Sequence, residues 1–390
     1  MTASRWWVVS DLHLGPWGAD PRGTAEAFAR FLAREVAPAT GNTHVVLLGD
    51  TFELVGLDAQ RGRNRLDELV LLNAEVFAEI GLCLRGGVRF HFVCGNHDVD
   101  LARPAVADRL VELLSADGPT DQVTVHPWAL HEPGLLFAEH GHQHHPLQRL
   151  PTLLLASVSG TDDLDPPPMV AWTDRTGRTG TIARTGRTGT IARTSRALPT
   201  RSIGPAGWTG STMRRAAAVA RAFSSTRRAE RRALTPGYVS MLSAESERIG
   251  ITPEAARALW RVSGFRTLPA IAGTARRLLS RRLGRAPQGL GMLPAAARVA
   301  RTLTDHGTPI RWYVSGHTHR AIDAPIPGST TRYLNTGTWC SDVRDRGPDH
   351  DDPSCYPYAQ IDVADDGTAT GALRYWRDSR RVVGAERLVG

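Results

Sequence analysis

The chain has 390 residues, a formal net charge of +8 and a sequence pI of about 10.0. Hydrophobic residues make up 41% and charged residues 22%, which is typical of a globular protein and excludes a largely disordered chain. No run reaches the roughly 18 apolar residues of a membrane-spanning helix, and the first residues lead directly into an apolar strand. We therefore expect a cytoplasmic protein that is at most peripheral to a membrane.

Strand and helix patterns alternate over roughly the first 140 residues. Apolar strands are predicted at 6–9, 45–48, 90–94, 123–125 and 135–138. Helical spacing of apolar residues covers the segments between the first four strands, at 24–36, 66–80 and 105–114. This order indicates a layered α/β domain with its functional residues at one edge of a sheet.

The middle of the chain carries most of the positive charge. Residues 146–310 contain 26 arginines against nine acidic residues. Two copies of RTGRTGTIA occupy 175–192, and we expect this repeat to lack regular structure because it offers almost no apolar surface to bury. Helical patterns follow, one beginning at Thr252-Pro253-Glu254 and a basic one at 268–283.

Strand patterns return at 312–315, 332–334, 358–363 and 372–376, and we expect hairpin strands of a second sheet there. The chain thus divides into three parts. Residues 1–145 form the first part of a catalytic core, 146–310 an Arg-rich helical cap, and 311–390 the second part of the core.

Five short polar segments lie within the two core parts, and three of them directly follow a pattern typical of a buried strand. They are Asp11-Leu12-His13, Gly49-Asp50, Gly95-Asn96-His97-Asp98, His140-Gly141-His142 and Gly316-His317-Thr318-His319. Asp11 and His13 are two positions apart, so their side chains face the same way in extended chain. Asp50 has two carboxylate oxygens and can bridge two ions. We expect these groups to converge on a metal centre.

The mixture of carboxylate, carboxamide and imidazole groups suits Mn²⁺, Fe²⁺, Zn²⁺, Co²⁺ or Ni²⁺ and disfavours Ca²⁺. We expect two divalent ions, with Mn²⁺ as the first choice. Two ions about 3.5–4 Å apart activate a bridging water for in-line attack on a phosphoryl group. The sequence therefore predicts a two-metal hydrolase of phosphoester bonds.

The ordered motifs D-x-H, GD, GNHD, HGH and GHTH resemble the calcineurin-like metallophosphoesterase superfamily, and the sequence 334–337, LNTG, resembles that family's next strand. The resemblance implies a four-layer α/β/β/α sandwich, here with a mostly helical basic insertion. The sequences of 11–14 and 49–53 are most similar to those of the UDP-2,3-diacylglucosamine pyrophosphatase branch, although that branch has Arg at the position of His97. The protein Ser/Thr phosphatase branch is disfavoured, because it has Arg-Gly shortly after its GD.

The resemblance also implies a role for each motif residue. One ion falls to Asp11, His13, Asp50 and His319, and the other to Asp50, Asn96, His140 and His317. His97 lies beside the ions and either protonates the leaving-group oxygen after attack by the metal-bridging hydroxide or stabilises the charge there, while Asp98 holds the His97 ring. We expect His142 to face substrate or support a ligand, and His144 and His145 to face solvent. Glu53 is interpreted either as a pocket residue or as a surface carboxylate.

Three substrate or partner classes stay open. A small phosphorylated substrate is the first. A nuclease would instead use the arginines of 146–310 to bind nucleic-acid phosphates, and a non-catalytic module would use them on an anionic membrane or polymer.

Overall fold

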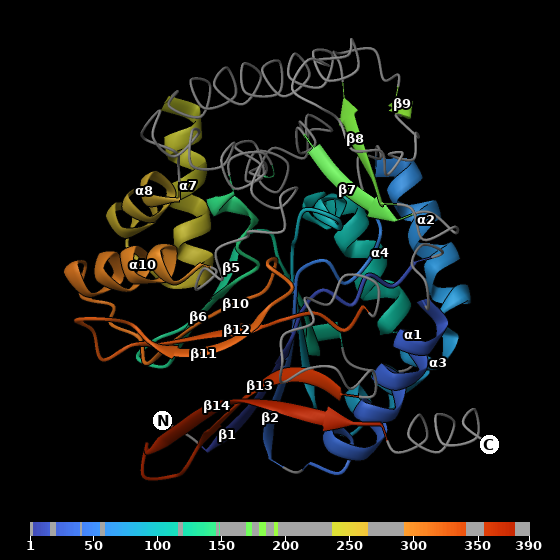
Figure 1. Ribbon diagram of the computed structural model, residues 1–390, viewed down its shortest axis with the longest axis horizontal. Coiled ribbons are helices and arrows are strands. Elements are labelled where there is room, and N and C mark those ends of the chain that lie inside the picture. Colours follow the sequence, from blue (N-terminus) through green and yellow to red (C-terminus); the bar gives the residue numbers. More distant parts are fainter. Residues whose placement is uncertain are drawn as a thin grey trace, which may run out of the picture.

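The computed structural model describes residues 3–15, 21–39, 41–54, 59–115, 120–145, 148, 169–173, 179–184, 191–193, 236–263, 292–340 and 355–378. Two β-sheets are stacked on each other, and helices cover the outer side of each (Figure 1). The predicted four-layer α/β/β/α arrangement is confirmed. Among the described helices, none is long and apolar enough to cross a membrane.

The first sheet has six strands. Its order is β14 (Ala369–Arg377), β13 (Cys355–Val363), β1 (Ser4–Val9), β2 (Asn42–Leu48), β3 (Arg89–Val93) and β4 (Val123–His126). Strands β1 to β4 are parallel, whereas β13 runs antiparallel to β1 and forms a hairpin with β14. The outer face packs against α1 (Pro21–Phe31), its continuation η1 (Leu32–Val36), α2 (Ala59–Leu72), α3 (Ala74–Arg85) and α4 (Pro104–Leu114).

The second sheet has five strands, in the order β11 (Ala321–Pro325), β12 (Arg332–Thr336), β10 (Trp312–Ser315), β6 (Leu136–Glu139) and β5 (Ala129–Glu132). Its outer face packs against α7 (Pro236–Ile249), α8 (Pro253–Val262) and α10 (Leu293–Asp305). A third core, which includes Trp6, Val46 and Val314, fills the space between the sheets. Short 3-10 turns lie at η2 (Val99–Ala102), η3 (Thr120–Gln122) and η4 (His142–His144).

The helices of the basic segment form a layer of the sandwich. Apolar residues of α7, α8 and α10 bury themselves against Phe137 and Tyr313 of the second sheet. Thr252 caps α8 as predicted, because its hydroxyl accepts a hydrogen bond from the Ala255 N–H at 3.1 Å. The basic helix expected at 268–283 lies outside the described residues.

Three predictions about elements were wrong. The hairpin β13–β14 completes the first sheet, because β13 pairs with β1 and its Ala359 and Ile361 join Trp6 and Val8 in the core between the sheets. Strands β10 and β12 pair in parallel and not as a hairpin. The helix expected at 66–80 is two helices separated at Asn73, whose side chain bonds the Leu69 carbonyl. The repeat is partly regular: β7 (Met169–Thr173), β8 (Thr179–Arg184) and β9 (Ile191–Arg193) form a small antiparallel sheet, in which Ile182–Arg184 pair with Ile191–Arg193.

A row of three histidines, His44, His91 and His126, crosses the first sheet. Trp6 stacks on His44, with ring centroids 3.8 Å apart. His44 Nδ1 lies 2.9 Å from His91 Nε2, and His91 Nδ1 lies 3.1 Å from His126 Nε2. Burial lowers the pKa of His44 to about 3 and of His91 to about 4. Burial therefore keeps these histidines neutral, and their contacts with Trp6 and with one another are structural.

Candidate metal centre

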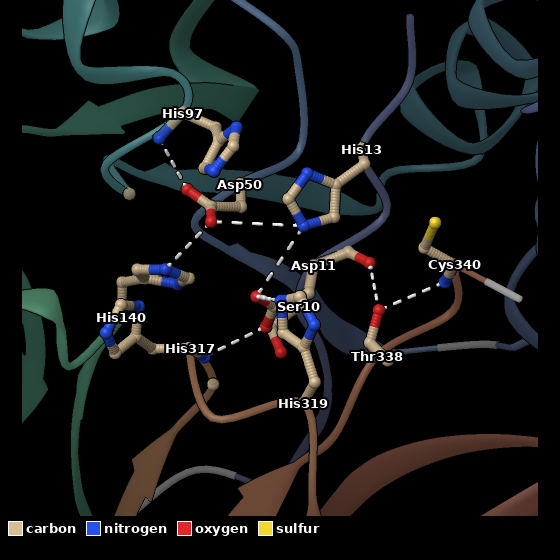
Figure 2. Close-up of polar contacts among 12 residues, drawn as sticks. Ser10, Asp11, His13, Asp50, His97, His140, His317, His319, Thr338 and Cys340 are labelled. Atoms are coloured by element: carbon tan, nitrogen blue, oxygen red, sulfur yellow. Dashed lines mark hydrogen bonds and ion pairs between the residues drawn. The ribbon is translucent and has the colours of Figure 1, made fainter. Parts of the chain in front are cut away.

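The polar motifs meet beside the carboxyl ends of strands from both sheets. Asp11 and His13 follow β1, Asp50 follows β2, Asn96 follows β3, His140 follows β6, and His317 and His319 follow β10. Figure 2 shows the labelled side chains of this set pointing toward one another from loops of both sheets. The convergence predicted from the sequence is therefore present in the fold.

The backbone at these motifs is strained. Among the residues that the structure describes, the only non-glycine positions with positive φ are Asp11 (54°), His13 (50°), Asp50 (52°), His317 (68°) and His319 (58°). The left-handed region costs roughly 1–2 kcal/mol per such residue. Hydrogen bonds between loops hold the strained chain, for example from the Asp11 N–H to the Gly49 carbonyl at 3.0 Å. Such strain collects at functional sites.

This strain gives the first prediction. In metal-stripped protein, His319→Gly should be about 1 kcal/mol more stable than His319→Ala, because glycine adopts positive φ without a Cβ clash. Denaturant unfolding measures the difference. At Thr318, where φ is not positive, the order should reverse, so Thr318→Ala should be more stable than Thr318→Gly. Equal stability of the two His319 variants would show that the position carries no strain.

The ligand atoms form two groups that share the space around Asp50. In the first, His319 Nε2 lies 3.0 Å from Asp11 Oδ1, and His13 Nε2 lies 3.9 Å from the same oxygen. In the second, His140 Nε2 lies 3.2 Å from Asp50 Oδ2, and His317 completes the group. Asp50 Oδ2 is also 4.0 Å from His13 Nε2. Asp50 thus stands between the groups, where a bridging carboxylate is expected.

Two buried polar atoms test whether these residues fit metal ions. His13 Nε2 and Asn96 Oδ1 are inaccessible to solvent and have no hydrogen-bond partner in the described structure. An unsatisfied buried polar atom costs about 1–3 kcal/mol, so such atoms normally have a partner. Each belongs to a different predicted ligand set and has a lone pair suitable for a transition metal. The donor set therefore fits two divalent ions.

Glu53 connects the first ligand group to His97. Its Oε1 lies 2.8 Å from His13 Nδ1, and its Oε2 lies 3.0 Å from His97 Nδ1. Burial raises the pKa of Glu53, but His97 and His13 lower it, to about 2 on balance. Both Nδ1 atoms therefore face a carboxylate and carry the proton, which leaves His13 Nε2 as a lone-pair donor. Although these three residues lie close enough for a third ion, their short contacts are those of hydrogen bonds.

The predicted role of Asp98 was wrong. Its carboxylate accepts hydrogen bonds from the backbone N–H groups of Gly95 at 2.6 Å and Thr51 at 2.7 Å. It holds the loops that carry Asn96 and Asp50, whereas Glu53 holds the His97 ring. The spacing of Asp50 and Glu53, with a carboxylate three residues after the turn, is the signal that could have indicated this. Burial lowers the pKa of His97, but Glu53 and Asp50 raise it, to about 9.

Two motif glycines are required by close approach. A Cβ on Gly95 would lie 2.2 Å from Asp50 Oδ1, and one on Gly316 would lie 2.5 Å from Asp11 Oδ2. Any side chain at either position would displace a carboxylate of the site. The glycines of the GNHD and GHTH motifs are thus part of the site geometry.

The histidines after His140 are more buried than predicted. His144 is not solvent-facing: its Nε2 lies 2.8 Å from Oε1 of Glu139, a buried carboxylate that also accepts from the Tyr313 hydroxyl at 2.9 Å. His145 is half-buried, with its ring 5.6 Å from that of His317. His142 is buried, with its ring 5.5 Å from that of His140 and its Nε2 3.1 Å from Gln143 Nε2.

Comparisons with known proteins bear on the family. Residues 4–176 match the family model of calcineurin-like phosphoesterases. No curated protein matches the chain significantly. The chain is similar to the phosphopantetheinyl hydrolase of Mycobacterium tuberculosis, with 15% identity over 89% of this chain and 94% of that one and a TM-score of 0.30.

A second similar structure is the sulfate thiohydrolase SoxB of Thermus thermophilus in complex with glycerol, with 12% identity over 97% of this chain and 57% of that one and a TM-score of 0.33. At scores this low, neither structure indicates what this chain acts on. The family match ends before His317 and His319, which the fold returns to the same centre. Residues 4–176 thus carry a calcineurin-like phosphoesterase domain.

Proposed function

We propose that this protein hydrolyses a phosphomonoester, phosphodiester or pyrophosphate bond in a small phosphorylated substrate, with two divalent ions, Mn²⁺ first among them. The observation that carries this proposal is the pair of ligand groups on either side of Asp50. Asp11, His13, Asp50 and His319 would hold one ion, and Asp50, Asn96, His140 and His317 the other. Bound there, the ions would activate a water and neutralise phosphoryl oxygens.

The chain's own groups prepare the site for that chemistry. The His97 backbone N–H donates to Asp50 Oδ1 at 2.7 Å, which fixes the carboxylate that both groups share. Glu53 accepts from His97 Nδ1 and so orients the ring. The proton on His97 Nε2 is then available to the leaving-group oxygen. Glu53 therefore takes the orienting role that the sequence had suggested for Asp98.

The cellular compartment is part of the same proposal. Cys83 and Cys94 are buried thiols, and burial raises the pKa of Cys83 to about 12, so it stays protonated. Buried thiols of this kind suit a reducing compartment. We accordingly place the activity in the cytoplasm.

Removal and return of metal tests the function. Protein stripped with a chelator should lose hydrolysis of generic monoester, diester and pyrophosphate substrates, and Mn²⁺ should restore it, because the donor set needs cations to act. Initial rates and bound Mn²⁺ are measured on the same samples.

The same panel separates the alternatives. Activity confined to small phosphoesters supports the proposal. A salt-sensitive activity on DNA would favour a nuclease whose basic segment binds phosphates. Two bound equivalents of Mn²⁺ without hydrolysis of any substrate would favour a non-catalytic binding module.

A further inference from the structure

Asn335 lies at the end of β12, beside the loop that carries His317 and His319. Its side chain is fully buried, and it is opposite Ser315 in the parallel pairing of β10 and β12. The Nδ2 atom lies 2.8 Å from the Gly316 carbonyl oxygen, 2.9 Å from the Tyr333 hydroxyl and 3.1 Å from Ser315 Oγ. Its two hydrogens serve these three acceptors, with one hydrogen shared between the two hydroxyls. The Oδ1 atom accepts from the Gly337 N–H at 3.0 Å. The whole amide is therefore engaged.

Gly316 is the residue through which the ligand loop leaves the sheet. Its N–H donates to the His140 carbonyl at 3.1 Å, so the loop is fixed to another ligand residue on that side. Its carbonyl accepts from Asn335, which fixes the other side of the same residue. The next turn contains His317 and His319, both with positive φ. A strained turn keeps its shape only when its surroundings determine it.

We propose that Asn335 is a positioning residue of the metal centre. Its amide holds the Gly316 carbonyl and thereby sets the direction of His317 and His319. These two imidazoles belong to different ligand groups, so one amide acts on both ion sites. The inference rests on the proposed function in taking the two groups as metal-binding.

The substitution Asn335→Asp tests this one contact. A carboxylate has the same shape as the amide but no N–H to donate. The hydroxyls of Ser315 and Tyr333 can rotate and donate to it, whereas the Gly316 carbonyl cannot. The variant therefore loses the hydrogen bond to the Gly316 carbonyl, whereas the contacts with Ser315 and Tyr333 can re-form with the hydroxyls as donors. Tyr333→Phe is the matched control, because it removes one partner of Asn335 and keeps the contact with Gly316.

The experiment measures Mn²⁺ affinity and stoichiometry by titration of metal-stripped protein, together with kcat, KM and the metal-free Tm. Asn335→Asp should bind Mn²⁺ ~10- to 100-fold more weakly than the wild type, the usual effect of losing a group that orients a ligand. At saturating Mn²⁺ its kcat should recover toward the wild-type value. Tyr333→Phe should keep wild-type affinity. Asn335→Ala, which adds no charge, should weaken Mn²⁺ binding in the same way.

Two results overturn the inference. One is wild-type Mn²⁺ affinity in Asn335→Asp. The other is a loss of affinity equal to that of Tyr333→Phe, which would indicate a general packing role. Failure of the proposed function looks different, because the wild-type protein itself would then bind no Mn²⁺ or show no hydrolysis.

Discussion

Replacing Asp50 with Asn should lower kcat/KM for a generic phosphoester by about three orders of magnitude or more, because charge stabilisation by the ions is worth several kcal/mol. Asp50 Oδ2 lies 3.2 Å from His140 Nε2 and 4.0 Å from His13 Nε2, so both ligand groups lose the same negative oxygen. Asn has nearly the same shape and can still accept from the His97 N–H. The fold should therefore survive.

Metal titration and thermal unfolding decide the Asp50 prediction. Asp50→Asn should bind fewer equivalents of Mn²⁺ than the wild type and should lose most of the Tm increase that Mn²⁺ gives the wild type. Its metal-free Tm should stay close to the wild-type value. Two tightly bound equivalents in this variant would show that Asp50 does not bridge the ions.

Replacing His97 with Ala should lower kcat by about 10²- to 10⁴-fold for substrates with alkyl leaving groups, the range for loss of a general acid. The His97 ring is held by Glu53 and is not in either ligand group around Asp50. Mn²⁺ binding should therefore be nearly unchanged. A nitrophenolate leaves without a proton, so nitrophenyl esters should lose much less activity than alkyl esters.

A leaving-group series measured on wild type and His97→Ala provides the internal control. The dependence of log kcat on the pKa of the leaving group should become steeper in the variant. An equal loss for alkyl and nitrophenyl substrates would instead assign His97 to substrate binding or charge stabilisation.

Local sequence patterns predicted an element well where the residues of that segment alone determine whether it forms a helix or a strand. The strands before residue 142 and the helix from Thr252 have clear apolar periodicity or capping residues, and the structure has them. The sheet to which β13 belongs depends on a partner hundreds of residues away, which no local pattern specifies. The small sheet that includes part of the repeat was missed for a related reason, since β8 pairs with β7 before the repeat and with β9 in its second copy.

The site shows the same division. Motif order and strand ends were enough to bring Asp11 and Asp50 to one edge of the first sheet, because the parallel strands β1 and β2 end together. His140 follows β6 of the second sheet and reaches Asp50 because the two sheets are stacked. The partner of His97 was assigned to its sequence neighbour, Asp98. The ring contacts Glu53 of another loop instead, because the Asp98 carboxylate is already occupied by backbone N–H groups. Hydrogen-bond partners of this kind are decided by three-dimensional proximity.

The position of β1 in the middle of the first sheet has a consequence for synthesis of the protein. Arg5 of β1 bonds Asp362 of β13, and these residues are 357 positions apart. At ribosomal rates of about 5–20 residues per second, the second residue emerges on the order of 20 to 70 s after the first. During that interval one side of β1 has no strand to pair with. The nascent chain thus exposes a strand edge with unpaired backbone N–H and C=O groups, which can pair with other chains. We expect the yield of folded protein to depend on chaperones that shield this edge until translation is complete.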